Sequence, residues 1–287
     1  VRIVMPPSAP RAALAAAAQR FAFSATPRLD AELLLAHALG ITRERLLLTL
    51  DDWSVPAAFD ALVERRAAHE PVAYLTGTRA FWTIDLHVAP GVLVPRADSE
   101  TLIEAAVAHF AGSSGPRRVL DLGTGSGALL LAALDEWPHA TGVGIDASAA
   151  ALTIARGNVE RLGMADRAQI IAGDWQGTGA AFDLVLCNPP YIEADASLPA
   201  EVRDWEPASA LFAGADGLDD YRRLAPALPS QIAPGGVACI EIGSEQGARA
   251  AALFRAVGLR VAIRRDLAGL DRERDVADRL DGAEVLG

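Results

Sequence analysis

Residues 118–127 read Arg-Val-Leu-Asp-Leu-Gly-Thr-Gly-Ser-Gly, and this stretch decides the fold class. Its apolar run Val119-Leu120-Asp121 predicts a buried strand, and a helical pattern over residues 128–136 follows directly. Glycines between them allow positive φ angles and a close approach of the backbone to a ligand. The first turn of a helix also offers N–H groups that no helical carbonyl uses. The stretch therefore predicts a strand, a ligand-binding loop and a helix in succession.

Strand and helix patterns alternate from this stretch toward the carboxyl end. Regular alternation requires crossover helices and therefore parallel strands, so we expect an α/β fold with a mostly parallel, Rossmann-like sheet. The further expected strands cover residues 142–146, 168–172, 182–187 and 237–242, and the further expected helices cover residues 149–162, 218–228 and 245–257.

The chain on the amino-terminal side of the loop has a different character. Residues 8–70 carry four helical patterns without a strand, which predicts a separate small bundle, and one of these helices should stop at Gly40. Residues 71–96 alternate enough to predict a β-hairpin linker, with residues 72–75 as one strand. A helix should then begin near Asp98 or Ser99 as N-cap and run to about Phe110.

Composition limits the classes of function. The chain has 287 residues and a net charge of −11, whereas a protein that grips phosphates usually has a basic surface. No apolar stretch reaches the roughly 18–20 residues that span a bilayer, and no signal-peptide pattern is present, so we expect a cytoplasmic protein. Cys187 and Cys239 lie in apolar runs and should be buried thiols, and no metal-ligand spacing is present.

The glycine loop indicates which kind of ligand to expect. Its Gly-x-Gly-x-Gly spacing fits the dinucleotide fingerprint Gly-x-Gly-x-x-Gly poorly, and no Gly-Lys-Ser/Thr follows for a P-loop. Asp146 ends the next expected strand, roughly 20 residues beyond the loop, where an acidic residue commonly binds two ribose hydroxyls. The alternatives are a plain tight turn for the glycines and a helix N-cap for Asp146.

A second motif, Asn188-Pro189-Pro190-Tyr191, directly follows the expected strand at residues 182–187. Neither proline has an N–H for a sheet ladder, so the strand stops there and a stiff turn begins. In an open α/β sheet, ligands bind at this carboxyl edge. An Asn amide and a Tyr ring presented there suit a planar group that bears an amide or an amine. An ordinary structural turn is the alternative.

These two motifs resemble those of a known enzyme class. The run Asp121–Gly127 resembles the first motif of class I S-adenosylmethionine-dependent methyltransferases, and Asn188-Pro189-Pro190-Tyr191 resembles the fourth motif of methyltransferases that act on planar nitrogen. Other segments from about residue 10 to about residue 270 resemble the HemK/PrmC family in particular. These segments are residues 28–35, 65–77, 81–82, 94–100, 201–207, 210–211 and 216–222.

The resemblance implies a function and an organisation. Family members transfer a methyl group from S-adenosyl-L-methionine to the side-chain amide of the glutamine in the Gly-Gly-Gln motif of class 1 peptide-chain release factors, and release S-adenosyl-L-homocysteine. The implied domains are a helical substrate-docking domain at residues 1–70, the linker at 71–96 and a methyltransferase domain with a seven-stranded sheet at 97–287. We expect a monomer that binds a release factor, with no nucleic acid, membrane or metal.

The resemblance also assigns roles to residues. Asn188 and the Pro189 carbonyl would accept hydrogen bonds from the substrate NH₂, Pro190 would keep the turn rigid, and Tyr191 would pack against the amide. Phe81, Pro95, Arg96 and Glu100 are candidates for the substrate pocket, although Arg96 and Glu100 could simply pair at a helix start. The implied cofactor-binding residues are Gly123, Thr124, Gly125, Ser126, Gly127, Asp146, Trp175, which would stack on the adenine or simply pack, and Asn188.

Two other functions fit parts of the sequence. An enzyme that methylates adenine amines in DNA or rRNA would use the same turn, but the acidic charge opposes it. A protein that binds the cofactor without catalysis would have no use for Asn188-Pro189-Pro190-Tyr191. One departure from the family is visible: residues 271–275, Asp-Arg-Glu-Arg-Asp, interrupt the apolar pattern where the final strand is expected.

Overall fold

A computed structural model describes residues 9–264, 274–279 and 284–286. The chain forms two compact units. The first contains the residues up to Thr78 together with Pro199–Trp205, and the second contains Arg79–Leu198 and the residues from Glu206 onward. The first unit therefore includes a short segment from far along the sequence. Among the described residues, no helix is both long and apolar enough to cross a membrane.

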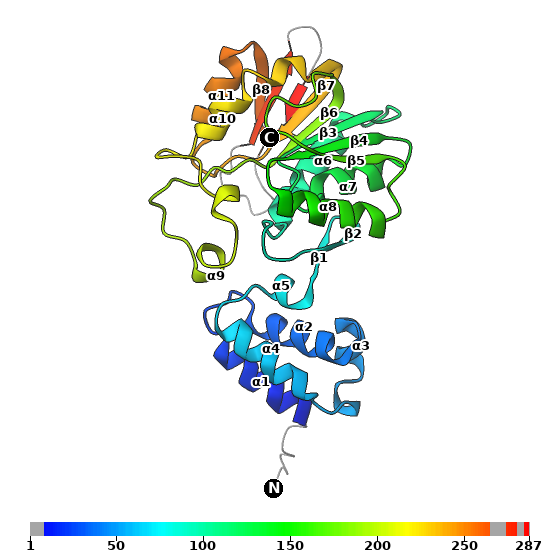
Figure 1. The fold of residues 1–287 in the computed structure, drawn as a ribbon, viewed down its shortest axis with the longest axis vertical. Helices are drawn as coiled ribbons and strands as arrows, with labels where there is room; N and C mark the ends of the chain where they lie inside the picture. Colours follow the sequence, from blue (N-terminus) through cyan, green and yellow to red (C-terminus); the bar gives the residue numbers. More distant parts are fainter. Residues whose placement is uncertain (1–8, 265–273, 280–283, 287) are drawn as a thin grey trace. The chain divides into compact units, whose positions relative to one another are not determined.

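The first unit is helical, as the sequence predicts (Figure 1). Its core consists of side chains at helical spacing, among them Leu14, Phe21 and Phe59, which are almost completely buried. Gly40 ends the second helix in the left-handed conformation at φ 66°, and its N–H bonds back to the last helical turn, which confirms the predicted stop. The helices are α1 Ala9–Arg20, α2 Pro27–Leu39, α3 Arg43–Leu48, α4 Ala57–Ala67, α5 Val72–Thr76 and α9 Ala200–Arg203.

The prediction of a strand at residues 72–75 is wrong, because these residues form α5. Pro71 precedes the helix, and Gly77 ends it at φ 70° in the left-handed region. Ala73, Tyr74 and Leu75 are all buried, whereas a strand that is half exposed would bury every second residue. The hairpin itself exists but is shorter than predicted and consists of β1 Thr78–Phe81 and β2 Ile84–His87.

The second unit is a sheet covered by helices, and the predicted α/β class is confirmed. Five neighbouring strands, in the order β7-β6-β3-β4-β5, run parallel (Figure 1). These strands are β3 Arg118–Leu122, β4 Thr141–Asp146, β5 Ala168–Ala172, β6 Phe182–Cys187 and β7 Ile232–Ile240.

The rest of the sheet continues beyond β7. Strand β9 Arg274–Arg279 lies antiparallel to β7 and to β8 Leu259–Arg264, and the short β10 Glu284–Leu286 pairs in parallel with β7 and β8. The described residues therefore form eight strands in this sheet, one more than the expected seven. The chain after β8 adds two strands, whereas one final strand was expected there. Of the charged run at 271–275, residues 271–273 lie outside the described residues.

Strand register brings four loops to one edge of the sheet. In β6, Cys187 is the partner of Leu122 in β3 and of Ile240 in β7. Ile145, one residue before the end of β4, is also a partner of Leu122. The residues that follow these strand ends, among them Gly123 and Asn188, therefore lie at the same level. This is the edge at which open α/β sheets bind their ligands.

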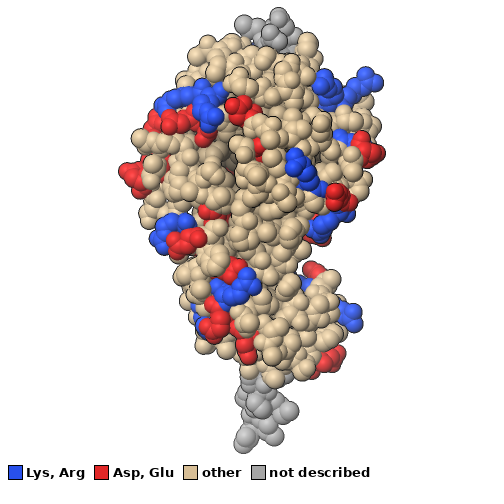
Figure 2. All heavy atoms as spheres, in the orientation of Figure 1, with Lys and Arg blue, Asp and Glu red and all other residues tan. Residues whose placement is uncertain are grey.

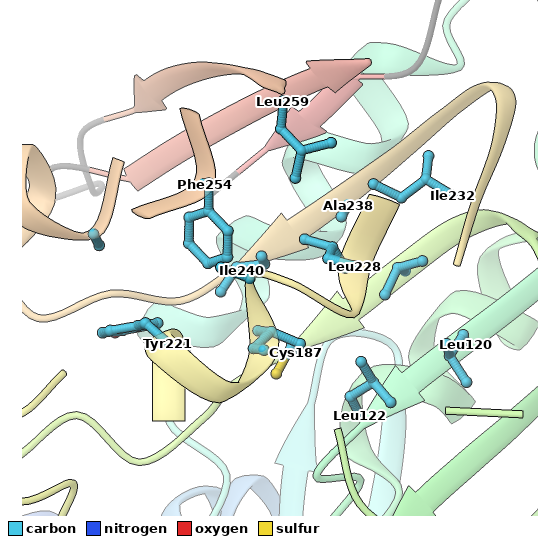
Figure 3. Packing of buried hydrophobic residues seen from close by; sticks show 14 of the residues in the cluster. Leu120, Leu122, Cys187, Tyr221, Leu228, Ile232, Ala238, Ile240, Phe254 and Leu259 are labelled. Carbon is cyan, nitrogen blue, oxygen red and sulfur yellow. The ribbon is translucent and has the colours of Figure 1, made fainter. Parts of the chain in front are cut away.

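Helices pack on the sheet through a large apolar cluster (Figure 3). Tyr221 of α10 Asp219–Leu224 and Phe254 of α11 Gly247–Ala256 lie against Cys187 and Ile240 of the sheet. Helices α6 Glu100–His109, α7 Ala128–Glu136 and α8 Ala149–Arg161 also contact the strands but contribute no residue to this cluster, which indicates that they cover the other face. Both cysteines are buried, as predicted.

Two expected elements have other bounds in the structure. The helix predicted over 218–228 ends at Leu224, because Pro226 has no backbone N–H to donate to a carbonyl of a continuing helix. Ser99 is the N-cap residue of α6, one of the two predicted, but its side chain makes no capping hydrogen bond to the helix. Its hydroxyl donates instead to Glu241.

A buried arginine organises the first unit. Arg66 is only 3% exposed and donates to Asp30 at 2.9 Å, and Asp30 is itself buried. Its Nη1 reaches Glu201 in α9 at 2.7 Å. Because an isolated buried charge is costly, the buried Arg66 and Asp30 depend on each other for compensation. The ion pair between Arg20 and Glu64 in the same unit is exposed and has no such role.

We expect Arg66→Ala to lower the free energy of unfolding by about 3–5 kcal/mol, because it leaves the Asp30 carboxylate buried without its partner. The matched change Arg20→Ala should lower it by no more than about 1 kcal/mol. Urea unfolding followed by circular dichroism measures both. Equal losses in the two variants would show that burial of the Arg66 ion pairs contributes nothing.

Candidate active site

A cavity of about 360 Å³ opens at the carboxyl edge of the sheet in the second unit. Residues from all the predicted motifs line it, including Gly123, Asp146, Trp175 and Asn188. Sequence positions far apart thus meet in one cavity because the strands that carry them are neighbours.

The glycine loop adopts the conformation for which the sequence selects glycine. Gly123, Gly125 and Gly127 have φ angles of 71°, 56° and 87°, which other residues rarely adopt. A Cβ at Gly123 would lie 3.3 Å from the Trp175 ring, so a larger residue there would also crowd the cavity. Thr124 and Ser126 line the cavity and are buried.

Asp146 ties the glycine loop to the end of β4. Its Oδ2 accepts from the Gly125 N–H at 2.9 Å, and its Oδ1 accepts from the Ser148 N–H at 2.8 Å. The cap of α8 is Ser148, whose hydroxyl accepts from the Ala151 N–H, so Asp146 is not the helix cap. A carboxylate has about four lone-pair sites, so Asp146 can accept two further hydrogen bonds from the cavity side.

Asp121 is a buried acid beneath the loop. Its Oδ2 accepts from the Thr124 hydroxyl at 2.6 Å and from the Leu130 N–H at 3.2 Å. Its Oδ1 is buried and has no hydrogen-bond partner among the described residues. Burial raises the pKa of Asp121 to about 7, although the hydrogen bonds from Thr124 and Leu130 oppose the rise.

Trp175 is fixed at both its backbone and its ring. The indole Nε1 donates to Asp220 Oδ1 at 2.9 Å, and the Trp175 carbonyl accepts from Gln231 Nε2 at 2.9 Å. The ring lies beside Gly123 and is partly buried against the apolar cluster of the sheet. It therefore forms a rigid apolar wall of the cavity.

The Asn188-Pro189-Pro190-Tyr191 turn begins where β6 ends. Asn188 and Pro190 line the cavity, and Pro189 is buried. The Asn188 Nδ2 donates to the Ser99 hydroxyl at 3.0 Å, and the Tyr191 hydroxyl donates to Glu241 Oε1 at 3.1 Å. The Tyr191 carbonyl accepts from Gln246 Nε2 at 2.8 Å. Both ends of the turn are thus anchored by side chains.

The remaining pocket candidates have distinct positions. Phe81, Pro95 and Arg96 line the cavity. Arg96 pairs with Glu206 at 2.5 Å, whereas Glu100 accepts from the Trp82 N–H at 3.0 Å. The alternative in which Arg96 and Glu100 pair at the helix start is therefore wrong, because each has a different partner.

Two groups at this site are not predicted by the sequence. The sequence predicts Ser99 only as a helix cap and gives Glu241 no role, yet both contact the Asn188-Pro189-Pro190-Tyr191 turn. Glu241 lies inside the strand expected at residues 237–242, whereas β7 ends at Ile240, so its place at a strand end is not predicted by the sequence. Its closeness to Asn188 is not predicted either, because it depends on the pairing of β6 with β7.

Comparisons with known proteins place the chain among methyltransferases. The family model described as the PrmC N-terminal domain matches residues 12–77, and the one described as the methyltransferase small domain matches residues 97–203. A solved methyltransferase from Pyrococcus furiosus, with 16% identity, aligns with a TM-score of 0.51 over 75% of this chain and 94% of that chain. The fold is therefore that of class I methyltransferases, as predicted.

Curated relatives are similar over most of the chain. The release factor glutamine methyltransferase of Rhodospirillum rubrum is 44% identical over 253 residues, which is 86% of this chain and 77% of the relative. That of Cereibacter sphaeroides is 45% identical over 262 residues, or 88% of this chain and 91% of the relative.

The stability of the protein should depend on pH through Asp121. Its pKa is about 7 in the folded chain and about 4 in an unfolded chain, so the folded state binds more protons between these values. The free energy of unfolding should therefore fall as pH rises from about 4 to about 7. Above about pH 7, Asp121 should no longer make it depend on pH. Asp121→Asn, which cannot titrate, should remove that component.

Urea unfolding of both proteins across this pH range measures the effect. The difference in free energy of unfolding between wild type and Asp121→Asn should change steadily between the two pKa values. A difference that stays constant with pH would contradict a raised pKa at Asp121.

Proposed function

Since the chain belongs to the family of release factor glutamine methyltransferases, we propose that it methylates the glutamine side-chain amide in the Gly-Gly-Gln motif of class 1 peptide-chain release factors. The methyl donor is S-adenosyl-L-methionine. The observation that carries the proposal is the position of Asn188, in the turn beside the glycine loop and on the wall of the same cavity.

The residues of the cavity fit this donor. The glycine loop, whose backbone lines the cavity, suits the methionine end of the donor because its glycines let a ligand approach the backbone closely. Asp146 retains acceptor capacity for two ribose hydroxyls, and the Trp175 wall offers an apolar surface to the adenine. No basic side chain is needed in the loop, because the donor has no phosphate.

The turn then acts on the substrate nitrogen. When bound, the donor supplies a methyl group on a positively charged sulfur. Asn188 Oδ1 and the Pro189 carbonyl accept hydrogen bonds from the substrate NH₂, which orients the nitrogen and stabilises the positive charge that develops on it. Two consecutive prolines keep these acceptors rigid. Tyr191 supports the turn through Glu241, and its ring would pack against the substrate amide.

Asn188→Ala should reduce kcat by about 10²–10³-fold, because it removes a preorganised acceptor from the transition state. The affinity for the donor should change by less than about threefold, since the glycine loop and Asp146 remain. Thr153→Ala, at an exposed position on α8, is the control for nonspecific effects. A kcat near that of the wild type would contradict the role of Asn188.

The nature of the acceptor is tested with labelled S-adenosylmethionine. We expect label on a purified release factor and none on DNA, because the chain carries a net charge of −11. On the face that Figure 2 shows, arginines and acidic residues are interspersed in small groups. Label on DNA would support an adenine-amine methyltransferase, and label on neither would support a cofactor-binding protein without catalysis.

We also propose that residues 1–70 dock the release factor, with residues 71–96 as linker and residues 97–287 as the methyltransferase domain. None of the described residues of the helical unit lines the cavity. Removing residues 1–70 should therefore weaken methylation of a release factor by at least about tenfold in kcat/KM while cofactor affinity changes little. Equal losses of both would show instead that the unit only stabilises the protein. We further expect a monomer.

A further inference from the structure

Three buried or half-buried polar groups form a chain that ends at the catalytic turn. Glu241 Oε2 accepts from the Ser99 hydroxyl at 2.5 Å, and the Ser99 oxygen accepts from Asn188 Nδ2 at 3.0 Å. Ser99 and Glu241 are 4% and 6% exposed. The Glu241 N–H bonds to the Cys187 carbonyl at 2.9 Å, which holds Glu241 level with Asn188 across two paired strands.

The direction of these hydrogen bonds has a chemical cause. A carboxylate can only accept, so the proton of the Ser99 hydroxyl is committed to Glu241. The Ser99 oxygen can then only accept, so the part of the Asn188 amide that faces it must be the NH₂ group. Among the described residues, Asn188 Oδ1 has no hydrogen-bond partner.

We propose that Ser99 and Glu241 are positioning residues that fix the Asn188 amide in one of its two orientations, with Oδ1 directed to the substrate NH₂. This inference rests on the proposed function of Asn188 as an acceptor. In the opposite orientation, the Asn188 NH₂ would face the substrate NH₂, two donors would meet, and the acceptor would be lost. An amide without this chain has two orientations of similar energy, so the chain supplies preorganisation.

The same carboxylate also holds the other end of the turn. Glu241 Oε1 accepts from the Tyr191 hydroxyl at 3.1 Å. Glu241, the residue after β7, thus anchors Tyr191 directly and anchors Asn188 through Ser99. A role for Ser99 as the cap of α6 does not explain its position, because its hydroxyl makes no bond to that helix.

Ser99→Ala removes the acceptor for the Asn188 NH₂ and should lower kcat for release-factor methylation on the order of 10–100-fold. KM for the donor and for the release factor should stay within about threefold, because the Ser99 hydroxyl is committed to Glu241 and Asn188. Ser99→Thr keeps a hydroxyl on the same carbon and should restore most of the activity. Ser113→Ala, whose hydroxyl bonds only within the loop after α6, is the matched control and should resemble the wild type.

Glu241→Gln tests the direction of the chain with almost no change in shape. A glutamine amide can donate to Ser99, which then releases its own proton toward Asn188 and turns the Asn188 amide around. We expect a loss of kcat comparable to that of Ser99→Ala, again with KM values little changed. A Glu241→Gln variant that loses the hydrogen bond from Asn188 to Ser99 and still has wild-type kcat would overturn the proposed direction.

A readout without substrate separates this inference from the proposed function. Nitrogen-15 NMR of the Asn188 side-chain amide should show a proton hydrogen-bonded to Ser99 in the wild type and in Ser99→Thr, and should lose it in Ser99→Ala and Glu241→Gln. The wild type could transfer no methyl group to a release factor while these signals change as stated. The proposed function would then fail, and the orientation of the Asn188 amide by Ser99 and Glu241 would stand. Unchanged signals and unchanged kcat in both Ser99→Ala and Glu241→Gln would overturn the proposed orientation.

Discussion

The parallel pairing of β6 between β3 and β7 is the constraint on which the site depends. It sets Cys187 level with Leu122 on one side and with Ile240 on the other. The residue after each of these strand ends carries chemistry: Gly123 opens the glycine loop, Asn188 opens the turn, and Glu241 anchors it. A shift of one residue in either pairing would turn alternate side chains to the other face and separate these groups.

Buried polar groups at this edge favour binding and catalysis at a cost in stability. Asp121 keeps an unpartnered oxygen in the interior, and its pKa is raised because nothing in the described chain compensates the buried charge fully. Such groups are expensive unless a ligand completes their hydrogen bonding. Glu241 differs, since both its oxygens accept from hydroxyls. Glu241 therefore suits a rigid support of the turn.

The α/β fold class, the conformation of the glycine loop and the turn at Asn188 could be predicted from the sequence, because each depends on residues that are neighbours along the chain. The positive φ angles at Gly123, Gly125 and Gly127 and the position of Asn188 at a strand end follow from neighbouring residues alone. The partners of Ser99 and Glu241 depend on which strands lie side by side, and no local pattern encodes that. Residues 72–75 were predicted as a strand but form α5, because the flanking Pro71 and Gly77 favour the start and the end of a helix there. The inclusion of Pro199–Trp205 in the helical unit likewise rests on long-range contacts of Arg66.

Tandem mass spectrometry of a release factor after reaction with the protein and S-adenosylmethionine tests the central claim most directly. The geometry of the Asn188 turn predicts one added methyl group, on the side-chain nitrogen of the glutamine in the Gly-Gly-Gln motif. A methyl group on another residue, or an unmodified glutamine alongside consumed donor, would contradict it.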